Sequence, residues 1–230
     1  MGPDTTMTDA ALYRLMTWLS PAYPVGAFSY SHGLEYAVEE GRVRDAGSLR
    51  LWLTDLLQLG SGRNDAILFR HAFEAAADPA ALREIAELAA AFAASSERHL
   101  ETTAQGRAFL EATCDAWPCE ALDRLREAWP GPLAYPVVAA VAAAGHGIAL
   151  TPSLQAYLQG FAANIVSAGV RLIPLGQSDG QRVIAALEAP IAATLEAALA
   201  APLEDLGGAA LLADLAAMKH ETQYTRLFRT

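Results

Sequence analysis

The residues in this chain that could do chemistry are a few scattered histidines, acids and cysteines. His71 and Glu74 are three positions apart, a spacing that places both side chains on one face of a helix, where they could share a metal ion. Metal sites in helical bundles use several Glu-x-x-His pairs. His71 and Glu74 stand in the reverse order, and no Glu-x-x-His pair occurs in the chain, so we expect structural roles for both residues. A helical metal-binding enzyme is kept as an alternative.

Other catalytic patterns are missing from the sequence. There is no phosphate-binding G-x-x-x-x-G-K-[ST] loop, no G-x-S-x-G nucleophile turn and no H-E-x-x-H motif. Cys114 and Cys119 are too few for a disulfide framework, and their spacing does not suit one metal on a regular helix. His32 and His146 each lie beside a glycine, where an imidazole commonly bonds to exposed backbone. We therefore expect no catalytic residue, no metal ligand and no stably bound cofactor.

Composition bounds the remaining possibilities. The chain has 230 residues, of which 53% are hydrophobic and 18% charged, and a net charge of −10. This balance argues against nucleic acid as a partner, because phosphate binding needs clustered lysine and arginine. The apolar window Leu133–Gly145 is interrupted by Pro136 and is shorter than the ~20 residues of a membrane span. With no signal-peptide pattern in its first residues, the chain is expected to be cytoplasmic and free of the membrane.

Apolar residues recur at helical spacing along most of the chain, as at Leu154, Tyr157, Leu158 and Phe161. Strand-like alternation of β-branched residues is absent. The sequence therefore predicts an all-α fold, a single helical-bundle domain over residues 1–230 with roughly ten helices.

The stretch 151–181 has the clearest start and stop signals. Thr151 and Pro152 are typical of a helix N-cap and first position. Pro174 should end this helix, and Ser178 with Gln181 has the spacing of a capping box that begins the next one.

Three polar residues lie at this break between helices. Arg171 stands where apolar character should be densest, so it either bonds the carbonyls at the helix end or contacts a partner. Gln177 and Asp179 are most simply turn and capping residues, with partner contact as the alternative.

The connecting segment Ser20–Glu35 is unusually aromatic. Its prolines forbid a helix at its start, yet it carries Tyr23, Phe28 and Tyr30. Loops are mostly polar, so these rings either fold back into the core or form an interface, and the sequence leaves both readings open.

The tail, about residues 219–230, also departs from the rest of the chain. It combines cations with large apolar residues: Lys219, Arg226, Arg229, Tyr224, Leu227 and Phe228. Arginine and aromatic residues are enriched at interface hot spots, whereas chain ends are usually polar and poorly ordered. We expect the tail to lack a fixed position in the free protein and to become ordered on a partner.

Four blocks of uncommon composition resemble a known family. They are WLSPAYPVGAFSYSHGLE (18–35), SSERHLETTAQGRAFL (95–110), RLIPLGQSDGQ (171–181) and MKHETQYTRLFRT (218–230). They look like the signature blocks of UreF-type urease accessory proteins, stand in that family's order, and extend the resemblance over essentially the whole chain.

The resemblance implies a non-catalytic all-α protein that forms a homodimer. It would bind the accessory protein UreD (UreH) and recruit the GTPase UreG, as a scaffold or chaperone for GTP-dependent nickel insertion into apo-urease. Nickel and GTP would be handled by the complex. An alternative is a GTPase-activating regulator that supplies Arg226 to UreG in trans.

The resemblance also assigns partner contacts to both aromatic segments. In the N-terminal segment, about residues 1–35, the candidates are Phe28, Tyr30, His32 and Glu35. In the tail they are Tyr224, Arg226, Phe228 and Arg229.

Overall fold

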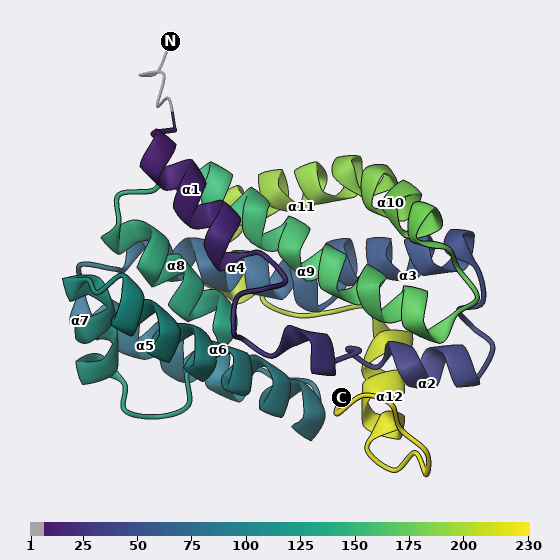
Figure 1. Ribbon diagram of the computed structural model, residues 1–230. Helices are drawn as coiled ribbons and strands as arrows, with labels where there is room; N and C mark the ends of the chain where they lie inside the picture. Colours follow the sequence, from purple (N-terminus) through teal and green to yellow (C-terminus); the bar gives the residue numbers. More distant parts are fainter. Residues whose placement is uncertain (1–6) are drawn as a thin grey trace.

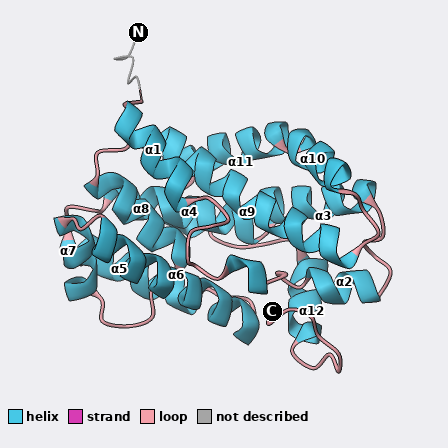
Figure 2. Cartoon of the chain, viewed as in Figure 1, coloured by secondary structure: helices cyan, strands magenta, loops and turns pink. Residues whose placement is uncertain are grey.

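The computed structural model describes residues 7–230, and within this range every regular element is helical (Figure 2). The predicted all-α class is confirmed, with twelve α-helices and two short 3-10 helices. The α-helices are α1 (Asp9–Trp18), α2 (Leu34–Glu39), α3 (Ala46–Leu59), α4 (Ser61–Glu74), α5 (Pro79–Ala91), α6 (Ser96–Ala116), α7 (Glu120–Ala128), α8 (Tyr135–Gly145), α9 (Leu150–Leu172), α10 (Gln177–Ala186), α11 (Glu188–Ala200) and α12 (Leu211–His220). The 3-10 helices are η1 (Ala27–Ser29) and η2 (Leu203–Asp205).

Helices α4, α8 and α9 form the centre of the molecule (Figure 1). Helix α8 is apolar on all sides, and its residues from Pro136 to Ala143 are buried, because α4, α6, α7 and α9 pack around it. Helix α9 buries the stripe that the sequence predicts, including Leu154, Leu158 and Ile165. The spacing of apolar residues thus fixes which faces point inward.

Two of the expected helix starts are wrong. Helix α9 begins at Leu150 after Ala149, with no side-chain cap, because the buried Ile148 fixes the entry of the chain. Helix α10 begins at Gln177, and its start is stabilised by Asp179, whose Oδ2 accepts the Gly176 N–H at 3.1 Å. Asp179 therefore takes the capping role that the sequence assigned to the pair around Ser178.

The stretch Gln177–Ala200 has the length and apolar composition of a membrane span, which the sequence analysis did not notice. In the structure it is two helices, α10 and α11, that meet at Leu187 and pack against α3 and α9. The expected absence of a membrane contact stays a prediction.

Helix α1 packs on the body through Ala11, Leu15 and Trp18, of which the aromatic Trp18 is the largest. Trp18 is 2% exposed, and its ring meets Phe109, Trp117 and His146 at centroid distances of 5.2–6.1 Å. At the other end of the chain, α12 lies across α2 and the tail returns towards the loop that precedes α2 (Figure 1). Segments nearly 200 residues apart in sequence therefore meet at one place.

Gly106 on α6 tests the packing of this core. A Cβ there would lie 2.1 Å from the Leu133 carbonyl oxygen, a backbone atom that cannot move alone. We expect Gly106→Ala to lower the free energy of unfolding by about 3 kcal/mol, which is about 6–12 °C in melting temperature for a chain of this size. Thermal melts followed by circular dichroism measure this.

The matched control is Gly47→Ala in α3, where the new Cβ would have an ordinary 3.4 Å contact. Alanine favours the helix there by about 0.5–1 kcal/mol, so this variant should melt at or above the parent's temperature. Equal melting of the Gly106 variant and the parent would contradict the packing described.

Candidate functional site

The tail folds back along the loop that precedes α2. The Arg229 N–H donates to the Ser29 carbonyl at 2.8 Å, and the Ser31 N–H donates to the Thr230 carbonyl oxygen at 2.7 Å. The Ser31 hydroxyl donates to the same oxygen at 2.6 Å. The tail is thus bound through its backbone, which differs from the expectation that it lacks a fixed position in the free protein.

Glu35 in the first turn of α2 is the main acceptor for the tail. Its carboxylate accepts the N–H groups of Leu227 and Phe228 at 2.6 and 2.9 Å. The Nε2 atom of His220 lies 3.2 Å from the same carboxylate. Glu35 is 8% exposed, and a buried carboxylate is tolerated only when its oxygens are paired in this way.

A second buried acid, Glu97 at the start of α6, completes the network. Its Oε2 lies 2.8 Å from Nδ1 of His220, and its Oε1 accepts from Arg226 at 3.0 Å. His220 is fully buried, with a carboxylate facing each ring nitrogen. His220 thereby links the first turn of α2 to the start of α6. We call Glu35, Glu97 and His220 the acid–histidine cluster.

Arg171 joins both aromatic segments to α9. Its guanidinium carbon lies 3.6 Å from the centre of the Phe28 ring and 4.3 Å from that of Phe228. It donates to the Phe28 carbonyl at 2.9 Å and to the Ser167 carbonyl of α9 at 3.2 Å. Burial lowers the pKa of Arg171 below its usual range, yet the charge persists and attracts both ring faces. These contacts support the structural interpretation of Arg171.

The candidate residues divide into two groups. Tyr30, His32, Glu35 and Phe228 are at most 8% exposed and form internal contacts, so in this conformation they position the segments instead of presenting a surface. Exposed candidates are Phe28, Tyr224, Arg226 and Arg229, with Tyr224 fully exposed and Phe28 66% exposed. Residues 1–6 of the N-terminal segment lie outside the described residues.

Gln177 and Asp179 stay apart from the tail. They lie at the start of α10, where Asp179 also pairs with Arg182. Within residues 7–230, neither has a hydrogen bond or ion pair to the tail.

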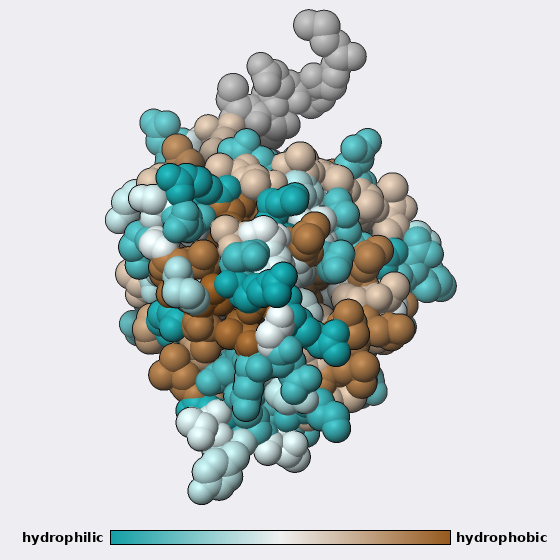
Figure 3. Space-filling model, turned by 90° about the vertical axis from the view of Figure 1, so that its right-hand side faces the viewer, coloured by the Kyte–Doolittle hydropathy of each residue, from teal (hydrophilic) through white to brown (hydrophobic). Residues whose placement is uncertain are grey.

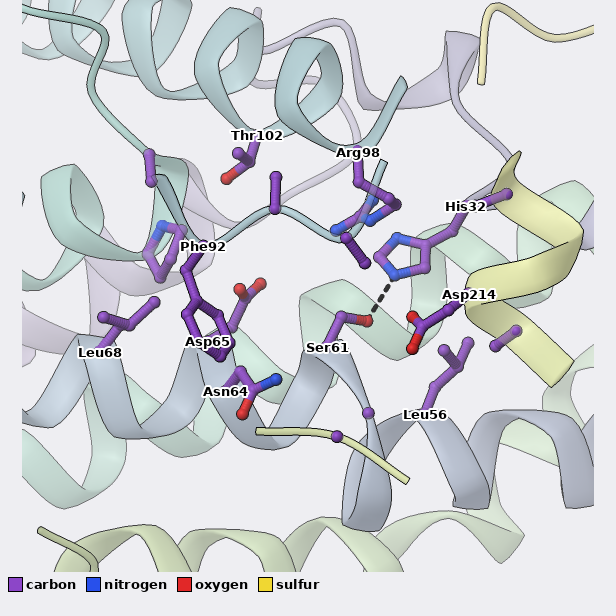
Figure 4. Close-up of a pocket in the computed structure, with 18 of the residues that line it drawn as sticks. His32, Leu56, Ser61, Asn64, Asp65, Leu68, Phe92, Arg98, Thr102 and Asp214 are labelled. Atoms are coloured by element: carbon purple, nitrogen blue, oxygen red, sulfur yellow. Dashed lines mark hydrogen bonds between the residues drawn. The ribbon is translucent and has the colours of Figure 1, made fainter. Parts of the chain in front are cut away.

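A cavity of about 250 Å³, lined by both apolar and polar side chains, lies beneath α12, between α4 and α6 (Figure 4). His32 reaches it from a left-handed backbone position (φ 59°), and its Nε2 lies 2.5 Å from the Ser61 hydroxyl. Figure 4 shows Asp65 and Asp214 directing their carboxylates into the same space. Helix α12 contributes Ala213, Asp214 and Ala217 to the lining of this cavity. It also packs closely on Gly33, where a Cβ would lie 2.8 Å from the backbone nitrogen of Ala217.

The charges around this cavity are set by burial and by Arg98. Burial and the Arg98 charge lower the pKa of His32 to about 4. Burial alone would raise the pKa of Glu101, but the ion pair with Arg98 and the contact with His32 lower it to about 2. Glu101 also accepts the Thr230 hydroxyl at 3.0 Å. Glu101, which is paired with Arg98 of the cavity wall, therefore contributes to holding the end of the tail.

The sequence analysis named none of Glu97, Arg98, Glu101, Asp65 and His220. The sequence does carry a signal for them on α6. Buried residues recur there every four positions, and all but the phenylalanine are polar: Glu97, Glu101, Gln105, Phe109 and Thr113. Polar side chains on the inward face of a helix must find internal partners.

The metal-site alternative finds no support in the described part of the chain. His71 Nε2 lies 3.1 Å from the Ala201 carbonyl, and Glu74 pairs with Arg70. Among residues 7–230, no three or more His, Cys, Asp or Glu side chains are arranged so that they could hold a metal ion. Cys114 and Cys119 are free thiols.

Comparison with known proteins decides the family. The model of the UreF family matches residues 43–188. The chain belongs to the UreF family. It is 56% identical over 230 residues to a urease accessory protein UreF of Rhodopseudomonas palustris, covering 99% of this chain and 95% of the relative. A UreF of Bradyrhizobium diazoefficiens is 55% identical over 96% of this chain and 92% of its own.

The UreF resemblance read from the four blocks is confirmed. Membership of this family makes the chain a urease accessory protein that serves urease maturation, and not an enzyme. The cluster and cavity described above are therefore features of an accessory protein.

Glu35→Gln should release the tail. A glutamine presents one amide oxygen to two backbone donors, so one buried N–H loses its acceptor, at about 1–3 kcal/mol. Hydrogen exchange at Leu227 and Phe228 should quicken by about 10–100-fold, with helical circular dichroism retained. In the control, Glu40→Gln, the exposed acid directly after α2 has no hydrogen bond to residues 219–230, so the tail should stay protected. Unchanged exchange in the Glu35 variant would show that the carboxylate does not hold the tail.

Asp65→Asn should stabilise the protein at neutral pH. Burial raises the pKa of Asp65 to about 6, against the smaller opposing effects of Arg98 and the Tyr157 hydroxyl, which donates at 2.8 Å. The folded state therefore binds more protons than the unfolded state between about pH 4 and 6, and Asp65 lowers stability as pH rises through this range.

Asparagine cannot ionise, so it avoids this loss of stability, and its amide oxygen can still accept the Tyr157 hydroxyl. The gain should be about 1–3 kcal/mol at pH 7.5 and vanish near pH 4. His32 and Glu101 titrate in both proteins, so the difference between the two melting curves isolates Asp65. A gain of the same size at both pH values would contradict the assignment.

Proposed function

We propose that this chain is the scaffold of a urease maturation complex, which binds UreD (UreH) through its C-terminal region and with it recruits the GTPase UreG. The observation that carries this proposal is the docked tail: the acid–histidine cluster fixes the tail while Tyr224 and Leu227 stay exposed, at 103% and 66%. Exposed aromatic and aliphatic side chains on a fixed backbone are suited to a protein interface.

An apolar face on α12 extends this surface. Its exposed side chains are Leu211, Leu212, Leu215 and Met218, each at least 46% exposed. Figure 3 shows apolar patches breaking the hydrophilic surface on the side of the molecule where α2, α3, α10 and α12 lie. Together with Tyr224 and Leu227, the α12 face forms the proposed UreD surface.

The proposed homodimer has a separate candidate surface on α1. Leu12, Tyr13 and Met16 share one side of that helix and are 44–68% exposed. A second copy would bury them. In this proposal the assembled complex binds nickel and GTP and inserts the nickel into apo-urease. This chain contributes protein contacts and no catalytic residue.

The regulator that supplies Arg226 to UreG in trans is less well supported. Arg226 is tied to Glu97 at 3.0 Å, so it would have to leave that pairing to reach a nucleotide. Adding the UreD complex to UreG and finding GTP turnover unchanged would exclude this function and leave the scaffold.

Tyr224→Ala with Leu227→Ser should weaken UreD binding by about tenfold or more, because exposed hot-spot side chains are removed. The melting temperature should stay within about 1–2 °C of the parent's, since surface substitutions change stability little. Co-purification and titration with UreD measure the effect. Leu51→Ser, at a similarly exposed leucine on α3, is the control and should bind as the parent does. Undiminished binding by the double variant would reject the tail as the contact.

A further inference from the structure

One side of α6 is covered by a loop instead of another helix. Leu100, Thr103, Arg107 and Leu110 lie along this side, and residues 129–133 of the α7–α8 connection form the opposite wall. The groove between them has a volume of about 510 Å³. It lies where α6 and α7 flank the molecule (Figure 1), and none of its residues contacts the tail.

Both walls of the groove are fixed in the free protein. The Leu133 carbonyl lies directly against Gly106, and the Tyr135 N–H donates to the Thr102 hydroxyl at 3.2 Å. The Trp129 indole N–H donates to the Pro132 carbonyl at 3.0 Å, which closes the loop on itself. A ligand would therefore bind a preformed groove, with no entropic cost of ordering its walls.

The apolar lining of the groove is open to solvent. Leu100 is 42% exposed, and Leu110 and Trp129 are half-buried. Tryptophan and arginine beside aliphatic side chains are the residues that dominate binding energy at protein interfaces.

Two arginines line this groove, against the negative charge of the whole chain. Arg107 and Arg126 have side chains 77% and 59% exposed, and their nearest acids, Glu111 and Asp123, are 4.0 Å away. Exposed pairs at this distance contribute little, so both guanidinium groups can accept a new carboxylate in a bidentate contact. No acidic residue is among those that line the groove, so the groove favours an acidic ligand, although the whole chain has 26 acidic and 16 basic residues.

We infer that this groove binds a segment of a partner protein that places a large apolar side chain against Leu100 and Trp129 and carboxylates against Arg107 and Arg126. A basic segment would be repelled by the two arginines. The groove is independent of the proposed UreD surface, so both can be occupied together.

The probe is a fluorescein-labelled peptide in which Leu-Phe-Leu is flanked on each side by two glutamates, with a lysine-flanked peptide of the same length as comparison. Fluorescence anisotropy should show saturable binding of the acidic peptide to the full-length protein, at least about tenfold tighter than the lysine peptide and weaker at higher salt. The indole N–H resonance of Trp129, assigned with Trp129→Phe, should shift during the titration.

The double variant Arg107→Glu/Arg126→Glu should lose binding of the acidic peptide by about tenfold or more and still co-purify with UreD. Arg50→Glu/Arg83→Glu, on α3 and α5, is the matched control and should bind as the parent does. Three results would each overturn the inference: no saturable binding up to about 1 mM, equal binding of the lysine peptide, or equal binding by the Arg107/Arg126 variant. If the parent protein failed to bind UreD, that result would contradict the proposed function and not the inference about the groove.

Discussion

The burial of two carboxylates, Glu35 and Glu97, is the constraint on which the C-terminal region depends. A buried charge is strongly unfavourable unless it is paired and hydrogen-bonded. Here each acid takes partners from α12 and from the tail: both face His220, Glu35 accepts two tail N–H groups, and Glu97 accepts from Arg226. These partners come from distant parts of the sequence, so the charges are satisfied only when all the segments meet.

The pairing of these two acids fixes the positions of α12, the tail and Arg171. With His220 held between the two acids, α12 lies across Gly33 and forms one wall of the cavity. Its apolar face with Leu211 and Leu215 is exposed. With the backbone at Leu227 and Phe228 held by Glu35, the Phe228 ring reaches Arg171. The arginine then binds Phe28 on its other side. One set of charge pairings therefore orders the loop, the last turn of α9 and the tail together.

The sequence predicts the helices well because periodicity reports which face of each helix is buried. Helix boundaries are less well predicted: at α9 the burial of Ile148 overrides the capping preference of Thr151. The aromatic loop shows a deeper limit. Core and interface were both open for it, and the structure buries Tyr23 and Tyr30 in the core and leaves Phe28 exposed.

The candidate site is predicted in part for the same reason. The family resemblance predicts Glu35, His32 and Phe228 as partner contacts, but it does not say whether these side chains instead make contacts within the chain. Their partners, such as Glu101 and His220, are 69 or more positions away in sequence. No local pattern encodes such pairings, and the acids on the inward face of α6 were the sign that buried partners must exist.

The docked tail changes the energetics expected of partner binding. Ordering a flexible segment is unfavourable by about 1–2 kcal/mol per residue, so a tail that ordered only on its partner would oppose binding by about 10 kcal/mol over residues 222–230. In this structure the intramolecular bonds to Glu35, Glu97 and Ser31 already offset that entropy. For the proposed UreD surface, affinity would then be set by the removal of Tyr224, Leu227 and the α12 face from water. Substitutions of Glu35 or Glu97 would weaken binding in another way. They free the tail, so that binding must again overcome the entropy of ordering it, but they do not change the side chains that make the contact.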